Sequence, residues 1–263
     1  MAKKANLKST VKTKKAAVKK KATALEISAT AKQFIAKLHA YQSDEEREKI
    51  QQYFKSGDGQ YGKGDQFMGI RMGTVFAVAK QHMNMEMDEI EKLLESPIHE
   101  IRAGGVSIMD FQARNKKTTP VRRKELFDLY LERHDRINNW DLVDRSAPYV
   151  VGGYLFDQPR TILYKLAKSK NVWERRTAIV STYFFIRQGD VNDTFRIAEL
   201  LLKDKHDLIH KAAGGWIREA GKRDRRQLFK FLDEHAAIMP RTMLRYAIER
   251  LDKKEKEYYM NMK

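Results

Sequence analysis

Residues 173–179 read Trp-Glu-Arg-Arg-Thr-Ala-Ile, and in this stretch Arg176 is followed by the two small residues Thr177 and Ala178. The same order of one base and two small residues occurs at three further places, Arg102-Ala103-Gly104, Arg145-Ser146-Ala147 and Lys211-Ala212-Ala213. Successive copies are 43, 31 and 35 residues apart. Self-similarity at intervals of roughly 20–50 residues is typical of chains built from stacked structural repeats. The sequence therefore contains a weak internal repeat.

Helical patterns surround these copies. The spacing of apolar residues from Ile27 to Leu38 predicts an amphipathic helix, and Ser43 with Glu46 can form a capping box for a second helix ending near Lys55. Beyond the glycine-rich loop at 57–65, helices are predicted over 71–83, 86–96, 98–114, 120–133, 140–155, 160–168, 172–187, 191–203, 206–221, 224–235 and 241–252. There is no convincing run of strands. Proline is tolerated at helix starts, where most of the prolines fall, but Pro148 lies inside a predicted helix and should kink it.

These helices and short links predict an all-α fold, a superhelical solenoid of paired antiparallel HEAT-like repeats, whose nominal length is about 40 residues. The repeated pattern has two interpretations. The small residues allow neighbouring helices to approach while the bases are solvated, or one base per repeat lines a concave basic groove. The overall charge favours the second.

Charge is unevenly distributed over the 263 residues, which carry 52 basic and 35 acidic side chains and a formal net charge of +17. Residues 1–25 contain nine lysines and no acid, so the remaining residues hold a net charge of +8. We expect a disordered Lys-rich arm at 1–24, a helical-repeat domain at 25–252 and a charged C-terminal tail at 253–263. Such a basic chain is expected to bind a polyanion.

Several classes of protein are excluded or disfavoured. The chain has no cysteine, which removes disulfide frameworks, zinc ribbons and thiol nucleophiles. Its most apolar stretch, 178–186, is far shorter than the roughly 20 residues that span a bilayer, and the N-terminus lacks the apolar region of a secretory signal. We expect a cytoplasmic protein, associated with the nucleoid in a bacterium, or a nuclear protein in a eukaryote.

Cofactor sites are not evident either. His206 and His210 are spaced i, i+4, but no third metal ligand accompanies them. The glycine-rich loop follows a helix and has no phosphate-loop pattern, so a nucleotide cofactor is not expected. Lys63 and Arg71, in and after this loop, are candidates for contact with DNA, and a flexible connection is the alternative.

The segment Asn138-Asn139-Trp140-Asp141-Leu142-Val143-Asp144 is the best candidate for chemistry. Asparagine and first-turn acids can simply stabilise a helix start. Asp141 can pair with Arg145 at i, i+4, whereas Trp140 and Asp144 share another face, which places an aromatic ring beside a carboxylate. Asp144 is therefore the better chemical candidate.

The helix over 206–221 offers two faces. Trp216 lies on an apolar stripe typical of a core residue. Lys211, Arg218 and Lys222 share another face with Gly215, where a phosphate backbone could approach closely.

Four segments together resemble the AlkD-like alkylpurine DNA glycosylases, a family built from HEAT-like repeats. The resemblance covers roughly residues 25–252, and its segments are Phe67-Met68-Gly69-Ile70-Arg71, Trp140-Asp141-Leu142-Val143-Asp144, Trp173–Ile179 and Lys211–Glu219. It implies base-excision repair, with hydrolysis of the N-glycosidic bond of cationic N3- or N7-alkylated purines in duplex DNA and no cofactor or metal. By this resemblance Asp144 is the catalytic carboxylate, Trp140 and Trp216 are aromatic walls, and Arg176 contacts DNA near the lesion. Spacing alone does not choose between Arg175 and Arg176.

Two other functions compete with a monomeric glycosylase. The same scaffold without catalysis could bind branched or bent DNA, since a fold does not by itself imply an activity. The remaining alternative is a helical-repeat scaffold that binds other proteins, and the clustered basic residues disfavour it.

Overall fold

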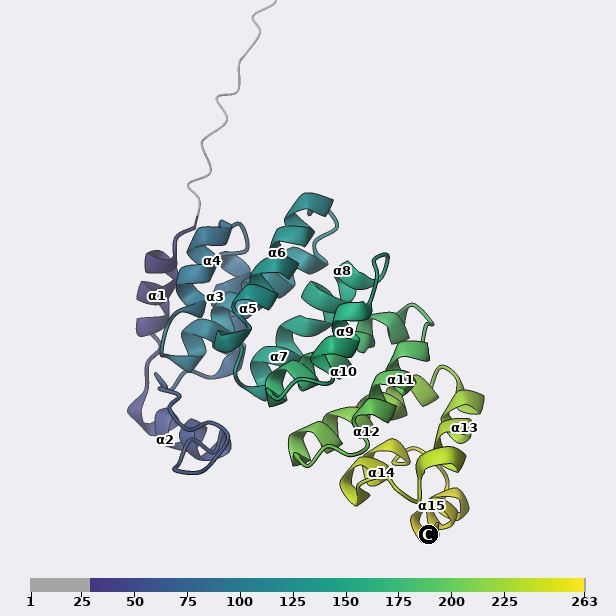
Figure 1. The fold of residues 1–263 in the computed structure, drawn as a ribbon. Helices are drawn as coiled ribbons and strands as arrows, with labels where there is room; N and C mark the ends of the chain where they lie inside the picture. The colour runs from purple at the N-terminus through teal and green to yellow at the C-terminus, as the bar shows by residue number, and fades with distance from the viewer. Residues whose placement is uncertain (1–28, 263) are drawn as a thin grey trace, which may run out of the picture.

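A computed structural model describes residues 29–262, and over this range the chain is helical, with one isolated parallel bridge between Gln66 and Ile98 (Figure 1). The elements are α1 (Ala31–His39), α2 (Asp44–Tyr53), α3 (Met72–Gln81), α4 (Met87–Leu94), α5 (His99–Arg114), α6 (Pro120–Glu132), the 3₁₀ turn η1 (His134–Arg136), α7 (Trp140–Ala147), the π-helical turn η2 (Pro148–Gly152), α8 (Gly153–Leu155), α9 (Thr161–Leu166), α10 (Val172–Arg187), α11 (Asn192–Leu200), α12 (Asp207–Gly221), α13 (Arg225–His235), α14 (Arg241–Ala247) and α15 (Lys253–Asn261). The expected arm at 1–24 lies outside the described residues.

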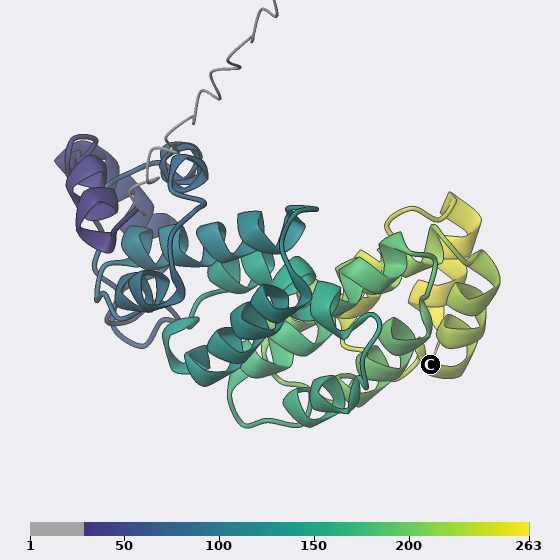
Figure 2. The same ribbon diagram turned by 90° about the horizontal axis from the view of Figure 1, so that it is seen from above.

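The helices form a solenoid, which confirms the predicted fold class. Along the chain α3 packs on α5, α5 on α7, α7 on α10, α10 on α12 and α12 on α14. Figure 2 shows this row bending into an arc, with the purple N-terminal helices and the yellow C-terminal helices at its two ends. No helix within residues 29–262 is both long enough and apolar enough to cross a membrane.

The repeated small residues lie where helices approach closely. Ala103, Ala178 and Ala213 are buried, and a Cβ atom at Gly104 would overlap the ring of Phe34 in α1. Each of the four bases of the repeat pairs with a carboxylate: Arg102 with Asp65, Arg145 with Asp110, Arg176 with Asp144 and Lys211 with Asp207. The small residues therefore serve close packing, and each base is paired: two of the pairs join different helices, Arg102 pairs with the loop residue Asp65, and Lys211 pairs within α12.

The helix predicted over 140–155, in which Pro148 was expected to cause a kink, changes its winding at that residue. Proline has no backbone N–H to donate to the preceding turn, and the residues Pro148–Gly152 form a π-helical turn between α7 and α8. A Cβ atom at Gly152 would overlap the carbonyl oxygen of Ser181, so this turn lies directly against α10.

The C-terminal end differs from the expected charged tail at 253–263. Residues Lys253–Asn261 form α15, which begins with a reciprocal capping box between Asp252 and Glu255. Tyr259 on this helix is buried, and its hydroxyl donates to Asp233 at 2.8 Å. The capping box and the buried ring of Tyr259 hold this highly charged segment against α13.

Candidate active site

A cavity of about 370 Å³ lies between α7, α10, α12 and α14. Its lining brings together Asp144, Arg176, Tyr183, Lys211, Ala212, Gly215, Trp216, Arg218, Glu219 and Tyr246. The size is within the range of small-molecule sites, and the lining carries five charged and three aromatic side chains. Eight of these ten residues belong to the segments that the sequence singled out, and the other two are Tyr183 and Tyr246.

The centre of this cavity is an ion pair between Asp144 of α7 and Arg176 of α10. Arg176 donates from Nε to Oδ1 of Asp144 at 2.8 Å and from Nη2 to Oδ2 at 2.7 Å, and its Nη1 donates to the carbonyl oxygen of Leu208 at 2.6 Å. The Arg176 side chain is 9% exposed, whereas that of Asp144 is 35% exposed. The guanidinium is thus held inside the fold, and it presents a carboxylate of fixed orientation to the cavity.

Burial and the ion pair act in opposite directions on the acidity of Asp144. Burial raises the pKa of the Asp144 carboxyl group above its ordinary value, and the charge and hydrogen bonds of Arg176 oppose this rise. The net result is a pKa of Asp144 above the ordinary value of an aspartate. Arg176 therefore keeps the ionised form accessible in a site that would otherwise favour the protonated acid.

The choice between the neighbouring arginines 175 and 176 is made by the packing of α10. Arg175 points away from the cavity, donating from Nε to Asp204 at 2.5 Å and from Nη1 to the carbonyl oxygen of Ser169 at 2.9 Å. The side chain of Arg176, which is expected to contact DNA near the lesion, is directed toward Asp144 and lines the cavity. Arg176 supports the Asp144 carboxylate from the buried side, by donating to both of its oxygens.

Trp216 and Trp140 lie in different surroundings. Trp216 is half-buried in the cavity wall, where its ring lies 4.9 Å from that of Tyr183, centroid to centroid. Trp140 packs instead toward α2 and the segment that follows it, with ring centroids 5.7 Å from Phe54 and 5.9 Å from Tyr53. The lining of the cavity does not include Trp140, although Trp140 and Asp144 lie one turn apart on α7.

The predicted cations are divided between the cavity and its surroundings. Lys211 and Arg218 line it, and Lys222 lies one turn beyond, where it donates to Glu219 at 2.7 Å. Arg71 donates to both oxygens of Glu46 at 2.8 and 2.9 Å, and Lys63 lies 3.0 Å from Asp58. The last two cations are exposed at the α2 end of the molecule.

Three residues of the lining, Glu219, Tyr183 and Tyr246, received no role from the sequence, although Glu219 ends the segment 211–219. Glu219 accepts hydrogen bonds from Lys222 and Arg218, and these bonds hold the pKa of its carboxyl group below its ordinary value although burial acts in the other direction. The sequence contained an indication of two of them, because Glu219 follows Gly215 by four residues and Tyr183 follows Arg176 by seven. Residues at these spacings lie on the same face of a helix. Tyr246 comes from α14 and had no such signal.

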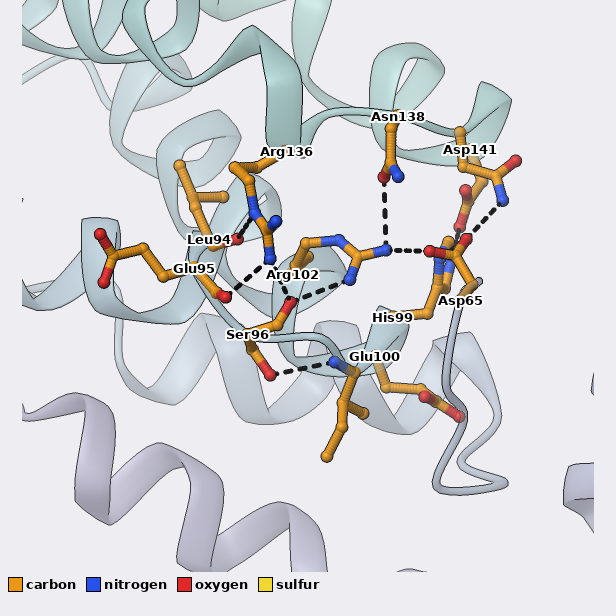
Figure 3. A network of polar contacts seen from close by, with 12 residues as sticks. Asp65, Leu94, Glu95, Ser96, His99, Glu100, Arg102, Arg136, Asn138 and Asp141 are labelled. Atoms are coloured by element: carbon orange, nitrogen blue, oxygen red, sulfur yellow. Dashed lines mark hydrogen bonds and ion pairs between the residues drawn. The ribbon is translucent and has the colours of Figure 1, made fainter. Parts of the chain in front are cut away.

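The start of α7, on which Trp140 and Asp144 depend, is held by a buried polar network (Figure 3). The imidazole of His99 lies between two carboxylates, with Nε2 at 2.8 Å from Asp141 and Nδ1 at 3.3 Å from Asp65. Burial lowers the pKa of His99, but the two carboxylates outweigh this and raise the pKa to about 9. Asp65 also pairs with Arg102 and accepts from Asn139 at 3.1 Å. The network thus joins the end of the glycine-rich loop, α5 and α7.

The motif Phe67–Arg71 is held by a neighbouring residue of the same region. Buried Glu100 accepts hydrogen bonds from the backbone N–H groups of Met68, Gly69 and Ile70 at 3.0, 2.9 and 3.2 Å. Gly69 has a φ of 80°, and a side chain there would overlap the backbone at Ser43. Glycine is the residue that this turn allows.

The two candidate metal ligands have structural roles. His206 accepts at Nδ1 from the backbone N–H of Leu208 and caps α12, and His210 contacts the carbonyl oxygen of Asp204 at 2.6 Å. Within residues 29–262 no group of three or more His, Asp or Glu side chains is placed to hold a metal ion.

Comparisons with known proteins concern the family and the fold. The sequence model of a family described as DNA alkylation repair enzyme matches residues 34–251. No curated protein matches the chain. Among solved structures, a predicted DNA alkylation repair enzyme from Enterococcus faecalis is similar with a TM-score of 0.65 and 17% identity, over 81% of this chain and 97% of that one. AlkD2 from Streptococcus mutans gives a TM-score of 0.46 and 17% identity, over 85% of this chain and 100% of that one. The first of these structures shows the same helical fold.

Proposed function

The chain belongs to the DNA alkylation repair enzyme family, and from this membership we propose that it is a DNA glycosylase. Its substrate is duplex DNA that carries cationic N3- or N7-alkylated purines, and the bond that it hydrolyses is the N-glycosidic bond. It acts where DNA is kept, in the nucleoid of a bacterium or in a nucleus.

The reaction suits the groups in the cavity. A purine alkylated at N3 or N7 is already positively charged, so it leaves without prior protonation, and most of the barrier lies in positive charge that develops on the deoxyribose. A carboxylate beside the anomeric carbon stabilises such an oxocarbenium-like transition state and can orient the attacking water. The ring faces of Trp216 and Tyr183 attract the same developing charge.

One observation carries the proposal. The Asp144 carboxylate is fixed on one side by a buried arginine and remains 35% exposed on the other side, in a cavity that it shares with Trp216. A carboxylate with only a structural role has no need of an open cavity beside it, whereas electrostatic catalysis requires a preorganised charge that the substrate can reach.

The test uses duplex DNA treated with a methylating agent, unmethylated duplex of the same sequence, and full-length protein. We expect chromatography to detect free methylated purine and an equal amount of abasic sites from the methylated duplex only. No release at any protein concentration that saturates the DNA would contradict the proposal.

Binding of branched or bent DNA without catalysis is the second candidate. The position of Trp140 favours it. Trp140 packs on Phe54 outside the cavity, so of the two tryptophan walls that were expected, Trp216 alone belongs to the lining. Salt-sensitive binding of junction DNA, without release of any base, would support this candidate over the first.

Arg176→Met is expected to reduce the rate of base release at pH 7 by up to about 100-fold, because Asp144 loses its fixed orientation. Burial would then act on Asp144 without an opposing cation, so the pKa of Asp144 rises further and the acid limb of the pH–rate profile moves to higher pH. Raising the pH should recover part of the activity, and Arg176→Lys should recover part of it at pH 7.

Arg175→Met is the matched control, since it removes a neighbouring guanidinium that pairs with Asp204 outside the cavity. Its acid limb should coincide with that of the wild type. An unchanged acid limb in Arg176→Met would refute the positioning role of Arg176.

A further inference from the structure

Two glycines lie side by side in α12, Gly214 and Gly215, and their surroundings differ. A Cβ atom at Gly214 would overlap the carbonyl oxygen of Met243 and lie 2.7 Å from Cβ of Tyr246. Gly214 is therefore required for the close packing of α12 on α14.

No packing contact requires glycine at position 215. A Cβ atom at this position would meet no heavy atom within 4 Å, and the residue lines the cavity beside Asp144 and Trp216. Glycine in the interior of a helix is less favourable than almost any other residue except proline. The helix thus carries a destabilising residue at a place where the fold itself would accept a side chain.

The neighbours of Gly215 indicate what occupies the open space. Lys211 lies one turn before it and Arg218 one turn after it, and both line the same cavity. Lys211 and Arg218 pair with the exposed carboxylates of Asp207 and Glu249, and because such surface ion pairs are weak, both cations can still attract phosphate. The bare backbone between them suits a sugar–phosphate chain, since the missing side chain lets the sugar approach.

We propose that residue 215 controls access to Asp144, and that the deoxyribose and phosphate of the substrate strand lie against the bare backbone of Gly215. This inference rests on the proposed function and names the part of the DNA that the cavity receives. A side chain at 215 separates the sugar from the carboxylate, and its Cβ atom meets no heavy atom of the protein within 4 Å.

The test compares Gly215→Ala and Gly215→Leu with the wild type. Both replacements are good helix formers, and the Cβ atom that they share has open space at this position. We expect Gly215→Ala to raise the melting temperature by about 2–4 °C. We expect Gly215→Leu to bind duplex DNA containing a tetrahydrofuran abasic-site analogue about 5–100-fold more weakly, measured by fluorescence anisotropy, with Gly215→Ala between Gly215→Leu and the wild type. Release of methylated purine should fall in the same order.

The matched control is Gly73→Ala in α3. A Cβ atom at Gly73 also meets nothing within 4 Å, but Gly73 does not line the cavity, so this variant should bind the analogue as the wild type does. Affinity and release within twofold of the wild type for Gly215→Leu would overturn the inference, as would an equal loss in Gly73→Ala and Gly215→Ala. If wild-type protein releases no base, the proposed function fails, and the affinity series still decides the role of Gly215.

Discussion

Replacing Asp144 with Asn is expected to reduce the rate of base release from methylated duplex DNA by about 100- to 1000-fold, the usual loss when one preorganised electrostatic group is removed from an active site. Asn keeps the size of Asp but carries no charge, so it cannot stabilise positive charge on the deoxyribose. Single-turnover release, measured by chromatography, separates this loss of chemistry from a loss of binding. DNA affinity should stay within a few-fold of the wild-type value.

Stability needs a separate measurement in this variant, because the uncharged amide of Asp144→Asn leaves the buried guanidinium of Arg176 without an anion. Loss of a charged hydrogen bond of this kind costs about 1–3 kcal/mol. Domains are typically stable by about 5–15 kcal/mol, so the variant should remain folded by circular dichroism.

Asp207→Asn is the control for the loss of one carboxylate. Asp207 lies at the start of α12, pairs with Lys211 at 2.7 Å and does not line the cavity. Its rate of base release should stay within a few-fold of the wild-type rate. Asp144→Asn with more than a tenth of the wild-type rate would show that another group supplies the charge.

Replacing His99 with Leu is expected to lower the free energy of unfolding by about 3–5 kcal/mol, the usual cost of leaving buried charges without a partner. The side chains of His99, Asp65 and Asp141 are 0%, 5% and 13% exposed, so water cannot take over the role of the imidazole. The rings of Phe54 and Phe67 cover it, at centroid distances of 4.6 and 5.1 Å. Arg102 would remain as the one cation paired with Asp65 in this network.

The effect of His99 has a defined pH dependence. Its pKa in the folded protein is about 9, above the ordinary value of 6.5, so the folded state holds the proton more tightly than the unfolded state. The contribution of His99 to stability is therefore fully present below pH 6.5 and is lost as the pH rises through 9. The difference of the two pKa values corresponds to roughly 3 kcal/mol. Urea unfolding at pH 6 and pH 9.5 should show this loss in the wild type and not in His99→Leu.

His134 provides the contrast, because burial lowers the pKa of this histidine. Its unfolded form holds the proton more tightly, so its effect on stability appears as the pH falls below 6.5. His134→Leu should keep the wild-type loss of stability between pH 6.5 and 9. The same slope in His99→Leu as in the wild type would show that His99 is not an imidazolium in the folded protein.

Helix positions could be predicted from sequence because they depend on neighbours along the chain. The helix expected over 172–187 is α10, and the expected change at Pro148 is a π-helical turn. Asn139 caps α7 as its residue type indicates, accepting from the backbone N–H of Trp140. Residues 253–263 were expected to form a charged tail, and Lys253–Asn261 form α15, whose cap at Asp252 and buried ring of Tyr259 were not considered in that expectation.

The amino-acid sequence alone determined the helices, their repetition and the candidate carboxylate, since 3.6-residue periodicity, capping and composition are local properties. Tertiary structure alone decided which side chains share the cavity. Arg175 and Arg176 differ by one position and face different partners, Trp140 turns toward Phe54, and Tyr246 reaches the cavity from a helix about 100 residues beyond Asp144. The physical reason is that the angle at which each helix packs on the next sets these directions, and that angle depends on contacts such as Gly152 with Ser181 and Gly214 with Met243, far apart in the chain.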